Sequence, residues 1–271
     1  AAVPLQDAAV AADELRYAVQ KLGHRAVQIG ARVEEEGLDA PQYDAFWSAA
    51  QELNVPVIIH PADLAVPPRI RRLFLHILVG NPSETTFAAA ALLLGGVFDR
   101  FPKLRVLLVH GGGCVPYQFG RIDRGRITAP PFAKGSVKNP LGQYANNLYY
   151  DTVLHDDEAF RYLIERVGAG QVALGSDYPF PLRDPDPVKF INKNNDMDDV
   201  AQRAGNLVQV VGNDSVMPGR HYLQVLVLEE ILHPVAGPGA GRPRHQQRAA
   251  GPFHPRHGAV RLGQFAVQAV G

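Results

Sequence analysis

The sequence predicts an α/β fold, and more narrowly a (β/α) barrel, from three observations. Between residues 13 and 212 the chain alternates helical stretches with short β-branched runs that end at Gly, Pro or Asp, which is typical of strands joined by helices. The strand-like runs are continuously apolar, as parallel strands are when both faces are buried. The chain has neither Gly-x-Gly-x-x-Gly nor the Gly-Lys-Ser/Thr of a phosphate loop, so an open doubly wound sheet is the less favoured alternative.

Five strands and three helices follow from this pattern. The strands are expected at residues 26–29, 55–59, 105–109, 148–150 and 172–174. The helices are expected at residues 39–53, 82–98 and 156–167. The second helix has the clearest start, because Asn81 as N-cap, Pro82 in the first turn and Glu84 suit the free amides that begin a helix. Phe46 and Trp47 on the first helix are expected to pack in the core.

Composition and charge exclude several classes of protein. Hydrophobic residues make up 46% and charged residues 20% of the 271 residues, which is typical of globular enzymes and not of disordered chains. The 27 Lys and Arg balance 27 Asp and Glu, so we expect no nucleic-acid or membrane partner, but a small molecule. The longest apolar stretch, residues 87–98, is too short to cross a bilayer. The single cysteine, Cys114, forms no internal disulfide, which fits a cytoplasmic location.

The two ends of the chain differ from its body. The sequence starts at Ala1 without a methionine or an export leader, and we expect an incomplete chain. Residues 213–271 hold five of the ten histidines, six arginines and only three acidic residues. We therefore divide the chain into a partial barrel of residues 1–212 and a Gly/Pro/Arg/His-rich tail. The tail is interpreted as an appended, poorly packed segment, with a basic binding tail or a metal-binding histidine tract as alternatives; only residues 222–228 resemble a strand or short helix.

Side chains of metal-binding type close three of the expected strands. His60 directly follows the second strand, His110 the third, and Asp177 comes shortly after the fifth. In a (β/α) barrel the chemistry lies at the carboxyl ends of the strands, where these three would converge. Imidazole and carboxylate are the ligands that a divalent ion such as Zn²⁺ takes when thiolates are absent. His110 precedes three glycines, which let the backbone approach closely and leave its ring accessible for proton transfer.

Two further residues are candidates for the site. Arg121 follows the glycines on a helix or loop, where its guanidinium could grip a carboxylate with two hydrogen bonds. The alternative for Arg121 is an ion pair with Asp123 or Asp99 on a solvated face. Asp151 closes the fourth strand at the same end of the barrel, where it would orient a histidine through a hydrogen bond.

Six motifs occur in order along the body of the chain, at residues 57–61, 81–86, 95–104, 110–113, 120–123 and 174–181. They read VIIHP, NPSETT, GGVFDRFPKL, HGGG, GRID and LGSDYPFP. Each motif is weak by itself. Together they closely resemble the aminocarboxymuconate-semialdehyde decarboxylases, which belong to the amidohydrolase-related metal-dependent barrels.

The resemblance implies a distorted (β/α)8 barrel of the TIM type with one divalent metal ion, usually Zn²⁺, with Mn²⁺ as the alternative. The family binds its metal through a His-x-His pair on the first strand, a later strand-end histidine that matches His60, and a late aspartate that matches Asp177. Its catalytic histidine, which activates water and moves protons, matches His110, and Asp177 acts with it. The family's arginine that reaches the substrate carboxylate across a dimer interface matches Arg121, which implies a homodimer.

The chain departs from the family in one respect, because no His-x-His occurs in it. Alternate residues of a strand share a face, so that spacing lets one strand offer two ligands to one ion. We therefore expect an N-terminally truncated barrel that lacks its first strand or two. His24, His76 and His155 are poor replacements for the missing pair, since none of them closes a predicted strand.

The predicted function is that of a metal-dependent, non-oxidative decarboxylase, a carbon–carbon lyase, which acts on a small unsaturated or aromatic carboxylate without an organic cofactor. Metal-dependent hydrolysis is an alternative, because the same apparatus serves both reactions. A second alternative is an inactive barrel fragment that binds metal weakly, since two ligands rarely retain zinc.

Overall fold

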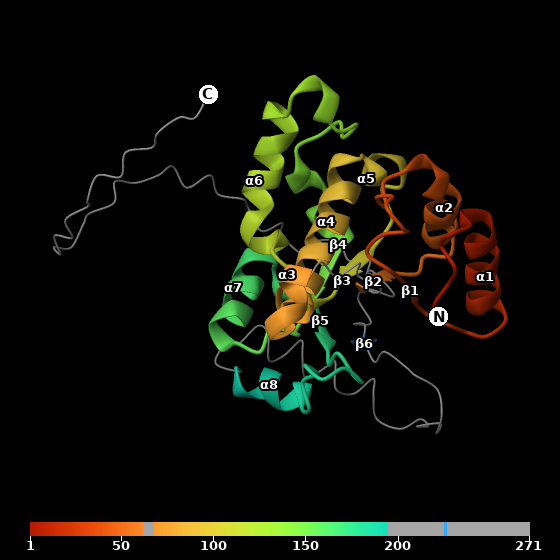
Figure 1. Cartoon of the computed structure of the whole chain (residues 1–271). Coiled ribbons are helices and arrows are strands. Elements are labelled where there is room, and N and C mark those ends of the chain that lie inside the picture. Colours follow the sequence, from red (N-terminus) through yellow and green to blue (C-terminus); the bar gives the residue numbers. More distant parts are fainter. Residues whose placement is uncertain (62–67, 195–224, 227–271) are drawn as a thin grey trace, which may run out of the picture. The chain divides into compact units, whose positions relative to one another are not determined.

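The structure, a computed structural model, describes residues 1–61, 68–194 and 225–226. The chain divides into two compact units, Ala1–Val235 and Ala236–Gly271, and the second lies wholly outside the described residues. Every described helix and strand belongs to the first unit (Figure 1). The predicted boundary between residues 212 and 213 also lies outside the described residues, so the division into barrel and tail stays a prediction.

Six strands of the described residues form one sheet in chain order. They are β1 (Val27–Ile29), β2 (Val57–Ile59), β3 (Val106–Leu108), β4 (Leu148–Asp151), β5 (Val172–Gly175) and β6 (Val225–Leu226). The first five are parallel, and β6 runs antiparallel to β5. The five parallel strands coincide with the five predicted ones, and β6 lies within predicted residues 222–228. Among the described residues no pairing joins β6 back to β1.

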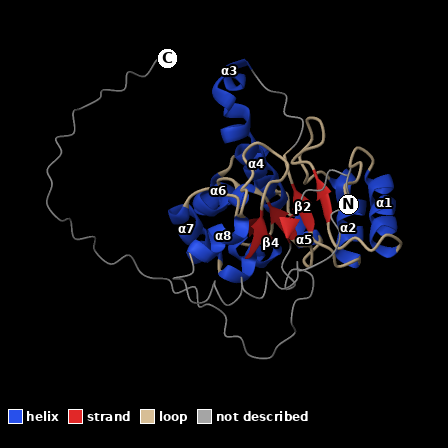
Figure 2. Ribbon diagram, turned by 90° about the horizontal axis from the view of Figure 1, so that it is seen from below, coloured by secondary structure: helices blue, strands red, loops and turns tan. Residues whose placement is uncertain are grey.

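Helical segments connect the parallel strands, and Figure 2 shows the strands lying between them. The eight described α-helices are α1 (Ala8–Gln20), α2 (Asp44–Glu52), α3 (Pro68–Arg71), α4 (Asn81–Leu94), α5 (Val97–Arg100), α6 (Val115–Thr128), α7 (Asp157–Val167) and α8 (Pro187–Lys193). The predicted helix 156–167 is confirmed as α7, and the carboxylate of Asp156 caps it by accepting from the Ala159 amide at 2.7 Å. The prediction for 39–53 corresponds to a 3₁₀ turn followed by α2.

The predicted start of the second helix at an Asn81 N-cap is wrong. A π-helical turn, His76–Gly80, runs directly into α4, and Asn81 has helical angles (φ −59°, ψ −50°) with no side-chain cap. The local capping signal is overridden because the amide of Asn81 already donates to the carbonyl of His76 in the preceding turn. The predicted end at residue 98 is also wrong, since Gly96 adopts φ +68° and separates α4 from α5.

The combined helix His76–Leu94 is long and apolar enough, by length and composition, to cross a membrane. Core helices of globular proteins pass the same test. One side of α4 lies in the protein interior and consists of Thr85, Ala88, Ala89, Leu92 and Leu93.

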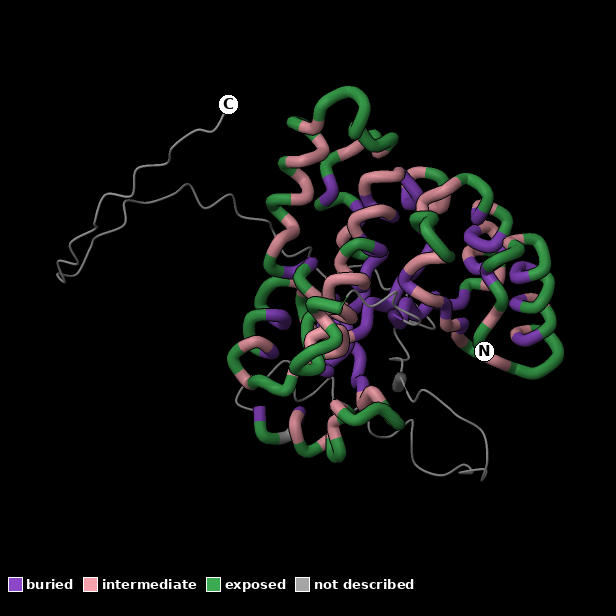
Figure 3. The backbone as a smooth tube through the Cα atoms, viewed as in Figure 1, coloured by how far each residue is buried: buried purple, intermediate pink, exposed green. Residues whose placement is uncertain are grey.

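The parallel strands bury both of their faces, as their continuous apolar sequences predict. One face packs against the helices and includes Val57, Ile59, Val106, Leu108, Leu148, Tyr150, Val172 and Leu174. The alternate residues form a smaller cluster of Ile58, Leu107, Val109, Tyr149 and Ala173 on the other face. Figure 3 shows the buried strands inside the exposed surfaces of the helices. Because side chains alternate along a strand, His60 and Asp151 continue the second face beyond Ile58 and Tyr149. Phe46 and Trp47 on α2 are fully buried, as predicted.

A glycine turn links β3 to α6 and packs against the start of α4. The φ of Gly113 is +59°, and a Cβ atom there would lie 2.1 Å from the carbonyl oxygen of Pro82 and 2.7 Å from Oγ1 of Thr86. The same Thr86 hydroxyl accepts a hydrogen bond from the amide of Cys114 at 2.8 Å. The turn and α4 are therefore held at a close and fixed distance.

We predict that Gly113→Ala lowers the free energy of unfolding by about 1–3 kcal/mol, the usual cost of a strained backbone position. Gly120→Ala on α6 is the matched control, because nothing lies within 4 Å of its Cβ position and alanine favours a helix by about 0.5–1 kcal/mol. Urea unfolding of both variants gives the comparison. A Gly113→Ala variant as stable as the parent would contradict the contact between the turn and α4.

Candidate metal and active site

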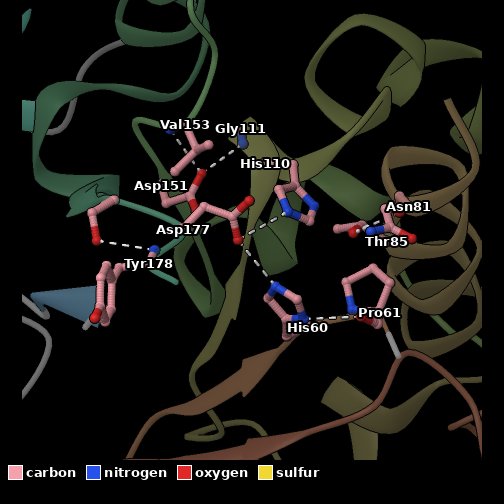
Figure 4. A network of polar contacts seen from close by, with 11 residues as sticks. His60, Pro61, Asn81, Thr85, His110, Gly111, Asp151, Val153, Asp177 and Tyr178 are labelled. Carbon is pink, nitrogen blue, oxygen red and sulfur yellow. Dashed lines mark hydrogen bonds and ion pairs between the residues drawn. The ribbon is translucent and has the colours of Figure 1, made fainter. Parts of the chain in front are cut away.

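Three side chains of metal-binding type meet at the carboxyl ends of the parallel strands (Figure 4). His60 follows β2, His110 follows β3 and Asp177 follows β5. Nε2 of His60 lies 3.3 Å, and Nε2 of His110 3.7 Å, from the same Oδ1 of Asp177. Each residue offers one ligand atom, and these atoms all lie within 4.8 Å of one another. The structure therefore brings together the three strand-end residues that the sequence singled out.

His60 is held in one orientation by two neighbours. Its Nδ1 lies 2.9 Å from the carbonyl oxygen of Pro61, which can only accept, so Nδ1 carries a proton. The ring of Phe180 stacks on the imidazole at 5.3 Å. In the neutral ring Nε2 then bears a lone pair that faces the carboxylate of Asp177. Nε2 of His60 and Oδ1 of Asp177 are both electron-rich. At their distance of 3.3 Å they repel each other unless a proton or a metal ion lies between them.

Asp177 supplies the negative charge of the cluster. Its side chain is 9% exposed. Burial raises the pKa of this carboxyl. The hydrogen bonds and positive charges that His110 and His60 offer when their rings are protonated outweigh that effect and lower the pKa to about 2. An ionised carboxylate beside an imidazole lone pair of fixed direction is a donor set that suits a divalent cation. The residues present therefore fit the metal that the motifs imply.

His110 lies in a turn that the following glycines make possible. Its φ is +57°, and those of Gly111 and Gly112 are +60° and +76°. A Cβ at Gly111 would lie 2.3 Å from the side chain of Leu154, and one at Gly112 would lie 2.4 Å from that of Tyr150. The turn thus presses against the end of β4 and holds the imidazole beside Asp177. Nδ1 of His110 is buried and has no hydrogen-bond partner among the described residues.

Asp151 contacts the backbone of this turn. It is 2% exposed and accepts from the amides of Gly111 at 2.7 Å and Val153 at 3.1 Å. Burial raises the pKa of Asp151, and the charge of His110 together with these backbone hydrogen bonds opposes the rise. Whereas the sequence predicts a bond from Asp151 to a histidine, the structure shows its carboxylate bound to backbone amides next to His110. An orienting role for Asp151 would act through the turn.

Arg121 is not brought to the cluster within this chain. It is exposed on α6 and does not line the cavity at the three strand-end residues. Its alternative partners are engaged elsewhere, since Asp123 pairs with Arg126 at 2.8 Å and Asp99 accepts from Tyr144. Arg121 is exposed, as the solvated-face alternative predicts. Within the described part of the chain it makes no ion pair, so the pairing with Asp123 or Asp99 that this alternative includes is wrong.

A cavity of about 710 Å³ opens at the cluster. Of the histidines that the sequence marks as poor ligand replacements, His24 lies apart from it, next to the N-terminal amine. His76 and His155 line it, yet neither belongs to the described metal-type cluster. Sequence reasoning missed this placement of His76, because it depends on the π-helical turn. The cavity therefore combines a cation-type cluster with further polar side chains.

Known proteins resemble this chain in sequence. A family model described as amidohydrolase matches residues 1–204. The 2-amino-3-carboxymuconate-6-semialdehyde decarboxylase of Dictyostelium discoideum is 33% identical over 217 residues, which cover 78% of this chain and 60% of that protein. The resemblance drawn from the six motifs is thereby confirmed.

Solved structures resemble it in fold. The 5-carboxyvanillate decarboxylase of Sphingomonas paucimobilis has a TM-score of 0.64 at 28% identity, covering 73% of this chain and 61% of that one. A dihydroxybenzoic acid decarboxylase of Polaromonas sp. JS666, solved with manganese and 2-nitroresorcinol, has a TM-score of 0.60 at 25% identity, covering 71% and 61%. The predicted amidohydrolase-like α/β fold is confirmed, and the chain spans 60–61% of the length of the first relatives it matches. Since the family model covers most of its residues, the chain belongs to the amidohydrolase family.

Proposed function

We propose that this protein is a metal-dependent, non-oxidative decarboxylase that acts on a small unsaturated or aromatic carboxylate. The observation that carries the proposal is the meeting of His60, His110 and Asp177 at one cavity. The relative from Dictyostelium discoideum and both solved neighbours are named as decarboxylases. The neighbour from Polaromonas holds an aromatic inhibitor, and a cavity of about 710 Å³ has the size of a site for such a molecule.

His60 and Asp177 are assigned to one divalent ion. The proton on Nδ1 of His60 directs its Nε2 lone pair to the cluster, and Asp177 contributes a carboxylate that stays ionised. When bound, such an ion polarises a substrate oxygen and lowers the pKa of water. Zn²⁺ is proposed because imidazole and carboxylate ligands suit it. Mn²⁺ is the alternative, since the neighbour from Polaromonas was solved with it.

His110 is assigned to proton transfer. Decarboxylation breaks the bond between a substrate carbon and its carboxylate, releases carbon dioxide, and leaves an electron pair on that carbon, which must accept a proton. His110 can supply this proton from the wall of the cavity. Asp177, 3.7 Å from its Nε2, is placed to balance the charge of the ring while the ring carries the proton. Asp151 supports the step by holding the backbone turn in place.

Arg121 is assigned to the substrate carboxylate, and a homodimer is proposed with it. The guanidinium is exposed on α6 and makes no ion pair within the described residues, so it is available to the cavity of a second copy. An arginine fork suits a carboxylate. A cytoplasmic location, inferred from the single cysteine, belongs to the same proposal.

Two alternatives compete with decarboxylation. Hydrolysis uses the same metal and proton carrier. An inactive fragment is favoured by one observation: the sequence has no His-x-His, and the metal-type cluster of the described residues has only three members.

We predict that the chain retains up to one Zn²⁺ or Mn²⁺ ion after dialysis, and that His60→Ala and Asp177→Asn each weaken metal affinity by at least about tenfold. His24→Gln is the control, because His24 lies apart from the cluster. Elemental analysis of the dialysed proteins gives the metal content. An affinity unchanged in His60→Ala and Asp177→Asn would refute the assigned ligands.

We also predict that the metal-loaded protein releases carbon dioxide from aromatic or conjugated carboxylates, and that His110→Asn lowers kcat by about 100-fold or more, the usual share of a general acid. Carbon dioxide capture with product mass measures the reaction. A hydrolysis product without carbon dioxide would transfer the assignment to the hydrolase alternative, and full metal content without turnover would favour the inactive fragment.

A further inference from the structure

We propose that His76 and Asn81 form a polar wall of the cavity that selects the substrate, by donating hydrogen bonds to a second oxygen-bearing group on the carboxylate. The proposal rests on the proposed function, because it specifies the substrate class of that site. It predicts a substrate with an acceptor such as a carbonyl or a second carboxylate, in addition to the carboxylate that is lost.

The cavity gives these two residues a distinct place. Its lining includes the cluster of His60, His110 and Asp177, and also His76 and Asn81 from the helical stretch before and within α4. Much of the remaining lining is apolar, with Ile77, Leu78, Pro82, Leu154, Phe180 and Leu182. In a largely apolar cavity, a few polar groups determine how a ligand is oriented.

His76 has an unsatisfied polar atom. Its Nδ1 is buried and has no hydrogen-bond partner among the described residues, a condition that is rare in folded proteins and calls for an explanation. The second ring nitrogen, Nε2, can carry the proton of a neutral imidazole and donate it to a ligand in the cavity that His76 lines. The edge-to-face contact with Phe74 at 5.3 Å holds the ring in position.

Asn81 is free for the same task. Because it lies inside the continuous helix, its side chain is not used for capping. Its backbone carbonyl accepts the hydroxyl of Thr85 at 3.2 Å, whereas its side-chain amide has no hydrogen bond within the described residues. An amide group on the cavity wall provides two N–H donors.

The polar wall is rigidly tied to the metal-type cluster. The π-helical turn His76–Gly80 leads into α4, and such turns occur frequently at functional sites. The start of α4 in turn packs against the glycine turn after His110, where Gly113 meets Pro82. The donors of His76 and Asn81 therefore keep a fixed distance from a ligand that is bound at the cluster.

The charges of the cavity favour an anionic ligand. Asp177 is the single acidic residue in the described lining, which also holds four histidines. Once the carboxylate of Asp177 is neutralised by a cation, no anionic side chain remains in the described lining to repel a ligand, and its other polar groups are imidazoles and the neutral amides of Gln28 and Asn81. We therefore assign the cavity to an acid with two oxygen-bearing groups.

The test is a binding comparison that needs no turnover. The probes are the three benzenedicarboxylates and the three methylbenzoates with the same substitution pattern, titrated calorimetrically into the full chain with and without Zn²⁺. We expect at least one dicarboxylate to bind about tenfold more tightly than its methyl counterpart. His76→Leu and Asn81→Leu should each reduce this ratio by about fivefold or more, with little change in methylbenzoate affinity.

Two variants separate hydrogen bonding from shape. His76→Gln keeps a donor and should preserve most of the preference, and it also serves if His76→Leu does not fold. Leu78→Met alters an apolar lining residue of the same turn and should leave the ratio unchanged. The proposal would be overturned if the parent showed no preference for a dicarboxylate over its methylbenzoate. It would also be overturned if the affinity ratio were the same in His76→Leu, Asn81→Leu and the parent.

The outcome is separable from that of the proposed function. Carbon dioxide release without any preference for a dicarboxylate would refute the role of the polar wall and support the decarboxylase proposal. If His76→Leu and Asn81→Leu both lose the preference for a dicarboxylate, and no acid releases carbon dioxide, the role of the polar wall would be supported and the decarboxylase proposal would be refuted.

Discussion

An ionised carboxylate facing two imidazole nitrogens at 3.3 and 3.7 Å is the constraint on which the site depends. In the neutral ring of His60, whose Nδ1 bonds the carbonyl of Pro61, Nε2 turns a lone pair toward Asp177. Such an arrangement is stable only with positive charge at its centre, from a proton on an imidazole or from a metal ion. The three side chains therefore form an arrangement that suits a cation, and the rest of the fold holds these side chains in position.

The scaffold places these groups by simple rules. Parallel strands end at one edge of the sheet, and alternation along each strand puts His60 and Asp151 on the face that bears Ile58 and Tyr149. The glycine turn then brings His110 back to the cluster, while the buried Asp151 binds the amide that follows it. Since Gly113 leaves no room for a side chain against α4, the same turn also fixes the opposite wall of the cavity.

The sequence could predict the strands and the three converging residues. A continuous apolar run marks a buried strand, and the polar residue after it marks a side chain at the carboxyl end of that strand. The sequence failed where tertiary context overrides a local signal. Asn81 has the sequence of an N-cap, yet the π-helical turn before it supplies the missing acceptor and leaves its side chain free. His76 has no local signal at all, since only that turn brings it to the cavity. The contacts of Asp151 with backbone amides likewise depend on the folded turn.

The central claim is that His60, His110 and Asp177 surround a single cation. The most direct measurement is an anomalous difference map from crystals of the chain grown with Zn²⁺ or Mn²⁺. The account predicts one strong peak within coordination distance of Nε2 of His60 and a carboxylate oxygen of Asp177, beside the ring of His110. Ordered side chains at the cluster with no peak between them, or a peak elsewhere in the chain, would contradict it.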